Sequence, residues 1–368
     1  MLSNLRVALV ADWLTSIGGA ESVVRALHDM FPQAPIFTFL HNKKKHSWLQ
    51  NADVSASFFQ KIPLARDYHQ FLISFMPYYF EQLDLDDFDL VISSSHACSK
   101  GVITKPATLH ICYCHTPMRY LWDDCHEYVR QYLPSRYFSF AAHHFLHSLR
   151  RWDKLAADRA DIFLANSNYV ARRIQKYYRR ESEIVYPPVD LSGFSPSIEE
   201  GNYYVAIGRL IPYKRFDLLI ETFNRLKLPL KIVGTGREYA SLKRLASDNV
   251  SFLGFVSREE LNSVLQRAKA LIFPQCEDFG IVPLEAMACG KPVIAYGCGG
   301  VLETVIQGET GIFFQEQSVD ALSSAIAQFQ HMRFDPVSIA SHVQKFSVEA
   351  FKERMTQVVE SCLVNNPR

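Results

Sequence analysis

The chain has 368 residues, more than one hydrophobic core usually organises, so we expect two domains. A formal net charge of +1 and a hydrophobic content of 48% describe an ordinary soluble protein rather than a disordered or strongly basic one. No run approaches the roughly 18 apolar residues of a membrane span, and no signal-peptide pattern opens the chain. We therefore expect a cytoplasmic protein.

The first half begins with a strand, a glycine-containing loop and a helix. Residues 5–11 form a short continuous apolar run, which is typical of a buried parallel strand. The loop at 12–21 contains Gly18 and Gly19 but lacks the G-x-G-x-x-G pattern, so it does not indicate a dinucleotide site. Further strands are predicted at 34–40, 88–93, 109–114 and 161–166.

A domain boundary is predicted where Pro, Ser and Gly cluster and periodicity lapses. The N-terminal domain then covers residues 1–186, the linker 187–200 and the C-terminal domain 201–346.

The second half alternates strands with helices. Strands are predicted near 203–208, 229–234, 250–254, 270–274, 292–296 and 312–315, and helices at 215–227, 237–247, 257–268, 283–289, 301–307 and 318–331. This alternation predicts an α/β fold with parallel, doubly wound sheets. Ligands of such domains bind at the carboxyl ends of the strands, here in the cleft between the two sheets.

Two carboxylates flank a predicted helix start in the C-terminal domain. Glu277 lies in a loop after an apolar run, and Glu285 lies eight residues later, inside the helix. Pro283 fits the first helical turn, where its missing N–H costs nothing. The free N–H groups of residues 280–282 would then offer a site for phosphate oxygens. Carboxylates around an anion site suit a ligand with phosphates and hydroxyls, such as a sugar nucleotide.

Two cations follow the first strand of the same domain. The apolar run 202–208 ends at Gly208, and Arg209 and Lys214 lie between this strand and the next helix. Arginine offers a fork of donors and lysine a mobile point charge, so the two side chains can converge on one diphosphate.

These patterns resemble retaining GT-B glycosyltransferases of glycosyltransferase family 4 (group 1). The resemblance rests on Glu-x7-Glu followed by Glu-Ala-Met-Ala-Cys-Gly-Lys-Pro, and on Gly-Arg-Leu-x3-Lys. It implies two Rossmann-like domains facing each other across a cleft, with a final helical segment, 347–368, that packs back on the first domain. The string Cys-His-Thr-Pro-Met-Arg-Tyr-Leu-Trp-Asp at 114–123 most resembles O-antigen and exopolysaccharide mannosyl- or glucosyltransferases.

The resemblance also implies roles for individual residues. Arg209 and Lys214 would hold the donor diphosphate, Glu285 the ribose, and Glu277 and His115 the transferred sugar. The catalytic candidates are Glu277, His115, Arg209 and Lys214. The other donor-binding candidates are Gly18, Gly19, Val233, Gly234, Phe255, Val256, Phe279, Gly280, Ile281, Val282 and Glu285.

The implied reaction moves a hexose from a nucleoside-diphosphate sugar to a saccharide or lipid-linked saccharide in bacterial surface or exopolysaccharide synthesis. UDP-glucose is slightly favoured as donor, with GDP-mannose next. Arg209 and Lys214 would do the task of a metal, so no metal and no further cofactor are expected. A GT-B-like sugar-nucleotide epimerase and a catalytically silent sugar-nucleotide-binding subunit stay open as alternatives.

Basic and aromatic residues gather in the first half. Residues 130–180 hold eleven Lys/Arg against three Asp/Glu, and the segments 58–61 and 71–80 are aromatic-dense. Such residues suit an anionic membrane on its inner face or a lipid-diphosphate acceptor. Arg150, Arg151, Arg172 and Arg173 are the expected surface cations. No nucleic-acid motif accompanies the charge, so no nucleic-acid partner is expected. The eight cysteines are expected to be reduced core or loop thiols.

Overall fold

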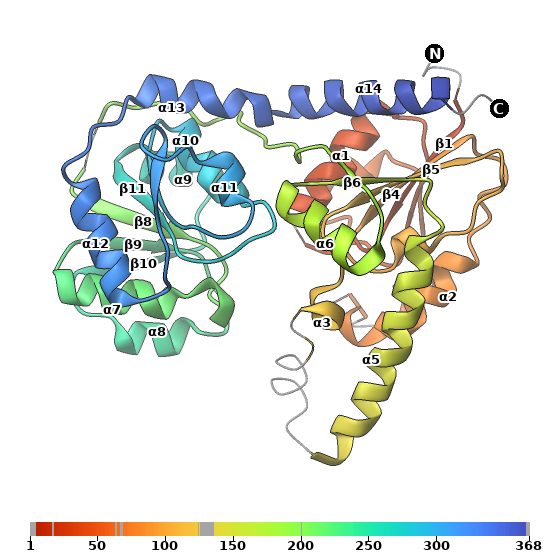
Figure 1. The fold of residues 1–368 in the computed structure, drawn as a ribbon, viewed down its shortest axis with the longest axis horizontal. Coiled ribbons are helices and arrows are strands. Elements are labelled where there is room, and N and C mark those ends of the chain that lie inside the picture. Colours follow the sequence, from red (N-terminus) through yellow and green to blue (C-terminus); the bar gives the residue numbers. More distant parts are fainter. Residues whose placement is uncertain are drawn as a thin grey trace. The chain divides into compact units, whose positions relative to one another are not determined.

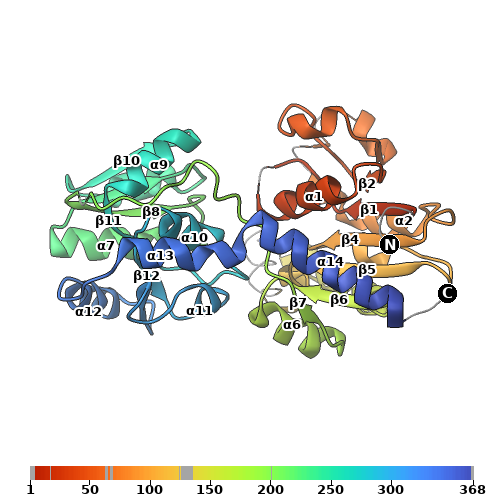
Figure 2. The same ribbon diagram turned by 90° about the horizontal axis from the view of Figure 1, so that it is seen from above.

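The computed structural model describes residues 5–365 except 17, 63–64, 67–68, 124, 126–135 and 200. The chain forms two compact units (Figures 1 and 2). Unit 1 is Met1–Pro188 with Phe351–Arg368, and unit 2 is Val189–Ala350. The segment predicted as a linker thus lies with unit 2 from Val189 onward.

Unit 1 is built on a seven-stranded sheet in the order β3-β2-β1-β4-β5-β6-β7, with every pair parallel. The central strands are fully buried, as their continuous apolar sequences require. The strands are β1 (Val7–Ala11), β2 (Ile36–Thr38), β3 (Val54–Ala56), β4 (Leu90–Ser95), β5 (Leu109–Cys114), β6 (Ile162–Ala165) and β7 (Glu183–Ile184).

The helices of unit 1 include α5, which extends away from the sheet of this unit (Figure 1). They are α1 (Gly19–Met30), α2 (Met76–Glu81), α3 (Arg119–Trp122), α5 (Arg136–Ala157), α6 (Asn168–Tyr178) and the short 3-10 turns η2 (Ser47–Gln50), η3 (Phe58–Lys61), η4 (His69–Phe75) and η5 (Ser99–Gly101). From Phe351 on, α14 (Val348–Asn365) belongs to unit 1. Its Lys352 pairs with Asp29 at 3.1 Å, and its Arg354 pairs with Glu183.

Unit 2 holds a six-stranded parallel sheet in the order β10-β9-β8-β11-β12-β13. The strands are β8 (Tyr203–Ile207), β9 (Leu230–Val233), β10 (Val250–Gly254), β11 (Ala268–Phe273), β12 (Val293–Tyr296) and β13 (Gly311–Phe314). The helices are α7 (Phe216–Leu226), α8 (Tyr239–Leu245), α9 (Arg258–Gln266), α10 (Ile281–Ala288), α11 (Val301–Thr304), α12 (Val319–Phe329) and α13 (Pro336–His342), with 3-10 turns η6 (Pro212–Lys214) and η7 (Val343–Phe346).

The hydrophobic core of unit 2 shows why apolar strands alternate with amphipathic helices in this unit. The apolar face of α7 packs with α12 on one side of the sheet, around Phe223, Ile232 and Ile326. The prediction of doubly wound parallel α/β sheets is confirmed. Among the described residues, no helix is long and apolar enough to cross a membrane.

Candidate functional site

Three strand-end loops of unit 2 are hydrogen-bonded into one layer. Gly208 N donates to Val233 O at 3.0 Å, and Gly234 N donates to Gly254 O at 2.7 Å. Gly234 has φ +133°, and a Cβ on it would lie 1.9 Å from Gly208 O, so no larger residue fits there. The donor candidates Val233 and Gly234 are thereby placed beside Gly208, and the loop after Gly254 carries Phe255.

Phe255 stands out in this layer because 87% of it is exposed. An aromatic side chain left in solvent at a strand end can cover the face of a bound ring. Val256 follows it, just before the capped start of α9, where Ser257 and Glu260 form a capping box. The predicted contact of Phe255 and Val256 with the nucleoside stays a prediction.

Lys214 and Glu277 are brought together by the loops after β8 and β11. Lys214 Nζ lies 2.6 Å from Glu277 Oε1, and both side chains are largely buried. The backbone of Glu277 is fixed as well, because its carbonyl accepts a hydrogen bond of 2.9 Å from Gly300 N. Two of the four catalytic candidates therefore form one ion pair at the carboxyl edge of the unit 2 sheet.

The predicted anion site is the start of α10. Gly280 precedes the helix with φ +89°, and Ile281 and Val282 open it, so their N–H groups have no partner within the helix. The Phe279 side chain is only 4% exposed and packs against Phe346 with ring centroids 5.8 Å apart. A contact between Phe279 and a donor is thus restricted to its backbone.

Glu285 lies on α10, within electrostatic reach of Arg258, the first residue of α9. Burial raises the pKa of Glu285 to about 7, which the charge of Arg258 opposes and that of Asp190 reinforces. Arg258 itself pairs with Asp190 at 3.2 Å. A carboxyl group that changes charge near neutral pH is typical of a functional site.

A disulfide joins the two loops that surround Glu277. Cys276 and Cys298 are bonded, with Cα atoms 5.1 Å apart. The expectation that all eight cysteines are reduced is therefore wrong for this pair, which the chain brings together from the ends of adjacent strands β11 and β12. The buried cysteines at positions 98, 112, 114, 289 and 362 are free thiols.

In unit 1, His115 lies at the carboxyl end of β5. Its Nε2 is 2.8 Å from Ser94 Oγ on β4, and its carbonyl accepts a hydrogen bond from Asn166 Nδ2 at 2.9 Å. Burial lowers the pKa of His115 to about 3, and the nearby imidazole of His96 contributes to this lowering. The histidine is therefore neutral at physiological pH, and its contact with the transferred sugar stays a prediction.

The glycine loop begins α1 at the carboxyl end of β1. Gly18 caps the helix with extended backbone, and a Cβ on it would lie 3.1 Å from Glu21 Oε2. Gly19 is the first helical residue. The close approach at Gly18 gives a local reason for glycine, while the predicted contact of Gly18 and Gly19 with a phosphate stays a prediction.

Asp12 and His96 were not among the residues predicted for the site. The buried carboxylate of Asp12 accepts hydrogen bonds of 2.6–2.8 Å from the backbone N–H groups of four consecutive residues, 96–99. His96 is thereby held at the end of β4, next to His115. The available signal was a lone acidic residue at the end of an apolar strand together with the polar string Ser-Ser-Ser-His after another.

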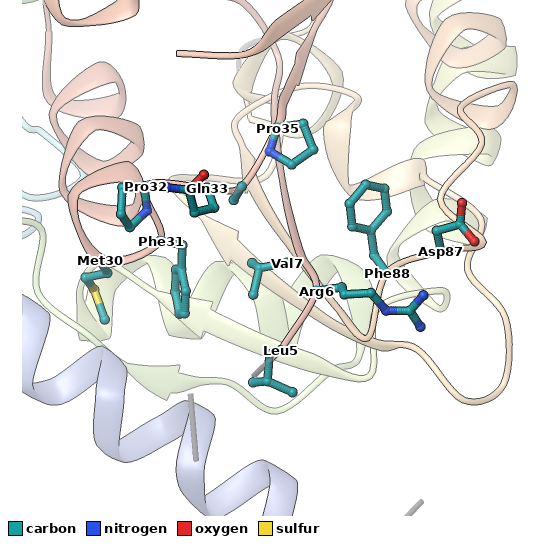
Figure 3. A pocket seen from close by; sticks show the side chains of 11 residues that line it. Leu5, Arg6, Val7, Met30, Phe31, Pro32, Gln33, Pro35, Asp87 and Phe88 are labelled. Carbon is teal, nitrogen blue, oxygen red and sulfur yellow. The ribbon is translucent and has the colours of Figure 1, made fainter. Parts of the chain in front are cut away.

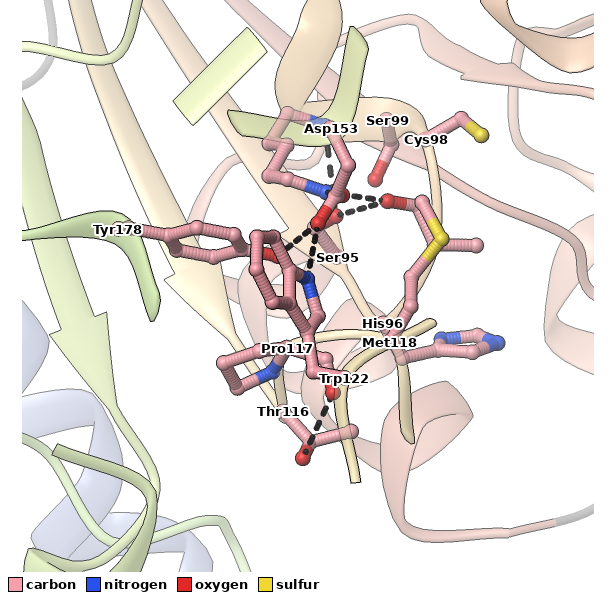
Figure 4. A network of polar contacts seen from close by, with 12 residues as sticks. Ser95, His96, Cys98, Ser99, Thr116, Pro117, Met118, Trp122, Asp153 and Tyr178 are labelled. Atoms are coloured by element: carbon pink, nitrogen blue, oxygen red, sulfur yellow. Dashed lines mark hydrogen bonds and ion pairs between the residues drawn. The ribbon is translucent and has the colours of Figure 1, made fainter. Parts of the chain in front are cut away.

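A buried polar network supports these strand ends from behind. Lys100 Nζ lies 2.5 Å from Asp153 Oδ1, and the side chains of Trp122 and Tyr178 donate to Asp153 Oδ2 at 2.7 and 2.8 Å (Figure 4). Burial, the largest single influence, lowers the pKa of Lys100, but the charge and hydrogen bond of Asp153 together with the nearby Cys98 and Cys114 outweigh it and raise that pKa. The network joins α3, α5 and α6 to the loop after β4.

A cavity lies at the opposite edge of the unit 1 sheet. It has a volume of about 400 Å³ and opens at the amino ends of β1 and β4, lined by Val7, Phe31 and Phe88 among others (Figure 3). Two Asp-x-Asp sequences, 84–86 and 87–89, precede β4 at this edge. None of the predicted site residues lines the cavity, so it is not the candidate site.

Comparison with known proteins places both halves of the chain. Residues 17–192 match the model described as Glycosyltransferase Family 4, and residues 191–360 match Glycosyl transferases group 1. A GDP-mannose-dependent monoacylated alpha-(1-6)-phosphatidylinositol monomannoside mannosyltransferase of Corynebacterium glutamicum is 30% identical over 55% of this chain and 62% of its own length. A D-inositol 3-phosphate glycosyltransferase of Mycobacterium leprae is 30% identical over 50% of this chain and 49% of its own. The chain thus spans about half to three fifths of the length of these relatives.

Solved structures show the same fold. Anabaena HepE in complex with UDP-glucose aligns over 96% of this chain and 99% of its own with a TM-score of 0.67 and 19% identity. The lipopolysaccharide outer core galactosyltransferase WaaB aligns over 97% and 99% with a TM-score of 0.66 and 17% identity. Together with the two matched halves, this shows that the chain belongs to the GT-B glycosyltransferases of glycosyltransferase family 4.

Proposed function

We propose that this protein is a retaining hexosyltransferase that uses a nucleoside-diphosphate sugar as donor. The observation that carries the proposal is the ion pair of Lys214 with Glu277, set beside the start of α10 and the loop that carries Arg209. The cations and backbone amides at this sheet edge suit the diphosphate of such a donor. A carboxylate suits the hydroxyl groups of its sugar and ribose. The acceptor is a saccharide or a lipid-linked saccharide of a bacterial surface or exopolysaccharide.

The chemistry follows from where charge develops. The bond from the anomeric carbon to the diphosphate oxygen breaks, a bond to the acceptor oxygen forms, and the acceptor proton passes to the leaving phosphate. Arg209, Lys214 and the N–H groups at the start of α10 would stabilise the departing negative charge. A bound diphosphate would compete with Glu277 for Lys214. This competition would release the Glu277 carboxylate to accept hydrogen bonds from the sugar. Because cations serve the diphosphate, we propose that transfer needs no metal.

The choice of donor rests on the relatives. The names of several relatives specify GDP-mannose, whereas HepE was solved with UDP-glucose. We propose UDP-glucose as the donor, slightly favoured over GDP-mannose. Thermal shift with UDP, GDP and ADP distinguishes the bases, since a ligand at a hundredfold its Kd stabilises the folded state by about 2.7 kcal/mol.

A membrane surface is supported by exposed aromatic residues of unit 1. Phe58, Phe75 and Tyr78 are 67%, 49% and 71% exposed. The ring of Phe59 lies near those of Phe58 and Phe75, with centroid distances of 4.3 Å to Phe58 and 5.1 Å to Phe75. Lys61 and Arg66 are exposed nearby along the chain. Rings at headgroup depth with adjacent cations suit an anionic leaflet, so we propose peripheral association through η3, η4 and α2.

The expected arginine surface needs correction. Arg173 is only 8% exposed and pairs with Asp123, and Arg150 donates to Leu121 O at 2.7 Å. Arg151 and Arg172 are exposed as expected. In residues 71–80, Met76, Pro77 and Phe80 are buried in the core. The segment 130–135 lies outside the described residues.

The experiment that tests the proposed function is a transfer assay. The protein is incubated with UDP-glucose or GDP-mannose and with octyl α-mannoside, octyl β-glucoside or an undecaprenyl-diphosphate-linked saccharide, in the presence of excess EDTA. We expect release of nucleoside diphosphate with formation of an α-glycoside, identified by NMR. Epimerised donor without transfer would favour the epimerase, and donor binding without turnover would favour the silent subunit. Activity that EDTA abolishes and magnesium restores would contradict the metal-independent mechanism.

A further inference from the structure

His96 and His115 lie side by side at the carboxyl ends of the adjacent strands β4 and β5. Their ring centroids are 6.1 Å apart, and the rings are inclined at 71°. Each imidazole has a polar contact on one nitrogen only. His115 Nε2 is hydrogen-bonded to Ser94 Oγ, whereas His96 Nδ1 lies 3.3 Å from Asp12 Oδ2, within electrostatic reach but without hydrogen-bond geometry. Among the described residues, the other nitrogen of each histidine has no hydrogen-bond partner.

The backbone at His96 is fixed by hydrogen bonds to the buried side chain of Asp12. Asp12 is only 1% exposed, and its carboxylate accepts from the N–H of His96 and from the next three N–H groups along the chain. Trp13 packs edge-on against the His96 ring at 4.4 Å. Backbone and ring are thus both fixed, which is how a binding side chain is pre-organised.

His96 differs from His110, which lies on β5, in its exposure. His110 is fully buried and its Nε2 is satisfied by Ser93 Oγ at 2.8 Å, so its role is structural. The side chain of His96 is 26% exposed, and Figure 4 shows its ring pointing away from the Asp153 network. The unpartnered Nε2 of His96 can therefore reach a ligand.

We propose that His96 binds the acceptor saccharide, with Nε2 accepting a hydrogen bond from an acceptor hydroxyl group. Asp12 is its positioning residue, because a carboxylate beside Nδ1 favours the tautomer that has its proton there and leaves Nε2 as an acceptor. This inference rests on the proposed function and adds to it the acceptor side of the site in unit 1.

The local charge favours a hydroxyl group over a phosphate at this position. The Asp12 carboxylate lies behind the ring and would repel an approaching phosphate, whereas a neutral hydroxyl pays no such cost. The cations predicted for the donor diphosphate, Arg209 and Lys214, belong to unit 2.

The test compares His96→Asn with His96→Gln, because asparagine places its amide near Nδ1 and glutamine near Nε2. Transfer is measured with the donor and octyl glycoside that the wild type uses best, and hydrolysis of the same donor is measured without acceptor. We expect His96→Asn to raise the acceptor KM about 3- to 10-fold, the loss of one hydrogen bond. Donor KM and donor hydrolysis should stay within twofold, and His96→Gln should recover much of the acceptor affinity.

The matched control is His331→Asn, at an exposed histidine of unit 2. An unchanged acceptor KM in folded His96→Asn overturns the inference alone. Equal losses in donor and acceptor KM also overturn it, because they indicate a purely structural role. Absence of transfer by the wild type overturns the proposed function and this inference with it.

Discussion

Lys214 Nζ and Glu277 Oε1 lie 2.6 Å apart, so the cation predicted for the diphosphate and the carboxylate predicted for the sugar neutralise one another in the structure. Neither residue is exposed enough for this to be a loose surface pair, since the side chains are 13% and 21% exposed. The pair explains how two opposite charges are kept ready in a partly buried site. In the proposed reaction, each would be stabilised by the other until a diphosphate and a sugar take their places.

The first prediction separates the two glutamates. Glu277→Ala should lower kcat, because interactions that strengthen in the transition state act on chemistry. Glu285→Ala should mainly raise the donor KM, since a ribose contact is similar in ground and transition states. Loss of a hydrogen bond to a charged group corresponds to about 1.5–3 kcal/mol, or roughly 10- to 150-fold. Steady-state kinetics measure both effects.

Two further variants sharpen this comparison. Arg209→Ala should impair kcat and KM together, because the diphosphate is bound before the reaction and gains charge as it leaves. Glu309→Ala, at an exposed glutamate of unit 2, is the control and should leave both parameters unchanged. Normal turnover by a folded Glu277→Ala protein would remove the central catalytic role assigned here.

The second prediction concerns the pH dependence of donor binding. Burial raises the pKa of Glu285 from 4.5 to about 7. In the proposed role, ribose hydroxyls would donate to the ionised form. The donor KM should therefore fall as pH rises through about 7, and Glu285→Gln should flatten this part of the profile. Kinetics between pH 5.5 and 8.5 with the same buffer ionic strength measure it. A wild-type donor KM that is constant across this range contradicts the assignment.

The ionisation of Glu285 should affect the stability of the protein in the opposite direction to donor binding: stability should fall as pH rises. In the folded state the neutral carboxyl is favoured, while in the unfolded chain Glu285 ionises near 4.5, so its contribution to the free energy of unfolding is present below pH 4.5 and lost as pH rises to about 7. Glu285→Gln should thus stabilise unit 2 above pH 7, by on the order of 1–3 kcal/mol.

The sequence predicted those parts of the structure that depend on local pattern. Strand positions such as Leu109–Cys114 follow from continuous apolar runs, and the start of α10 follows from Gly280 and Pro283. The short edge strands Val54–Ala56 and Glu183–Ile184 escaped prediction because two or three residues show no periodicity.

Pairings across the sheets could not be predicted for a different reason. Asp12 meets residues 96–99, and Cys276 meets Cys298, only because parallel strands bring distant loops to one edge. Sequence spacing carries no information on which loops become neighbours. The resemblance to a family supplied His115, but not His96, whose proposed role rests on its contacts.

The third prediction tests the aromatic surface. Replacing Phe58, Phe75 and Tyr78 together by serine should weaken sedimentation with phosphatidylglycerol vesicles, because these exposed rings would lose their place at headgroup depth. Binding by the wild type should also fall with added salt, since each cation near an anionic leaflet contributes on the order of 1 kcal/mol. Phosphatidylcholine vesicles should bind less.

The control for this surface is a pair of exposed apolar residues in unit 2, changed as Ile198→Ser with Val337→Ser. These changes remove apolar area elsewhere and should leave vesicle binding intact. If the triple variant sediments like the wild type, η3, η4 and α2 are not the membrane-binding surface.

The fourth prediction concerns the buried pair of Lys100 with Asp153. Asp153→Asn keeps an oxygen for Trp122 and Tyr178 but leaves the lysine charge buried without compensation, so we expect a loss of about 3–5 kcal/mol in the free energy of unfolding. All four tryptophans lie in unit 1, at positions 13, 48, 122 and 152, so urea unfolding followed by tryptophan fluorescence reports on this unit.

A matched control lies at the end of the same helix, where Lys154 and Asp158, just beyond the last helical residue, form a more exposed pair 3.0 Å apart. Asp158→Asn should change stability by less than about 1 kcal/mol, because charges near solvent are already stabilised by water. Replacing both members of the buried pair, as Lys100→Met with Asp153→Leu, should cost much less than the sum of the single changes, since no buried charge is left behind. Additive losses would show that the two charges do not depend on each other. The network would then hold α5 and α6 through the Trp122 and Tyr178 hydrogen bonds alone.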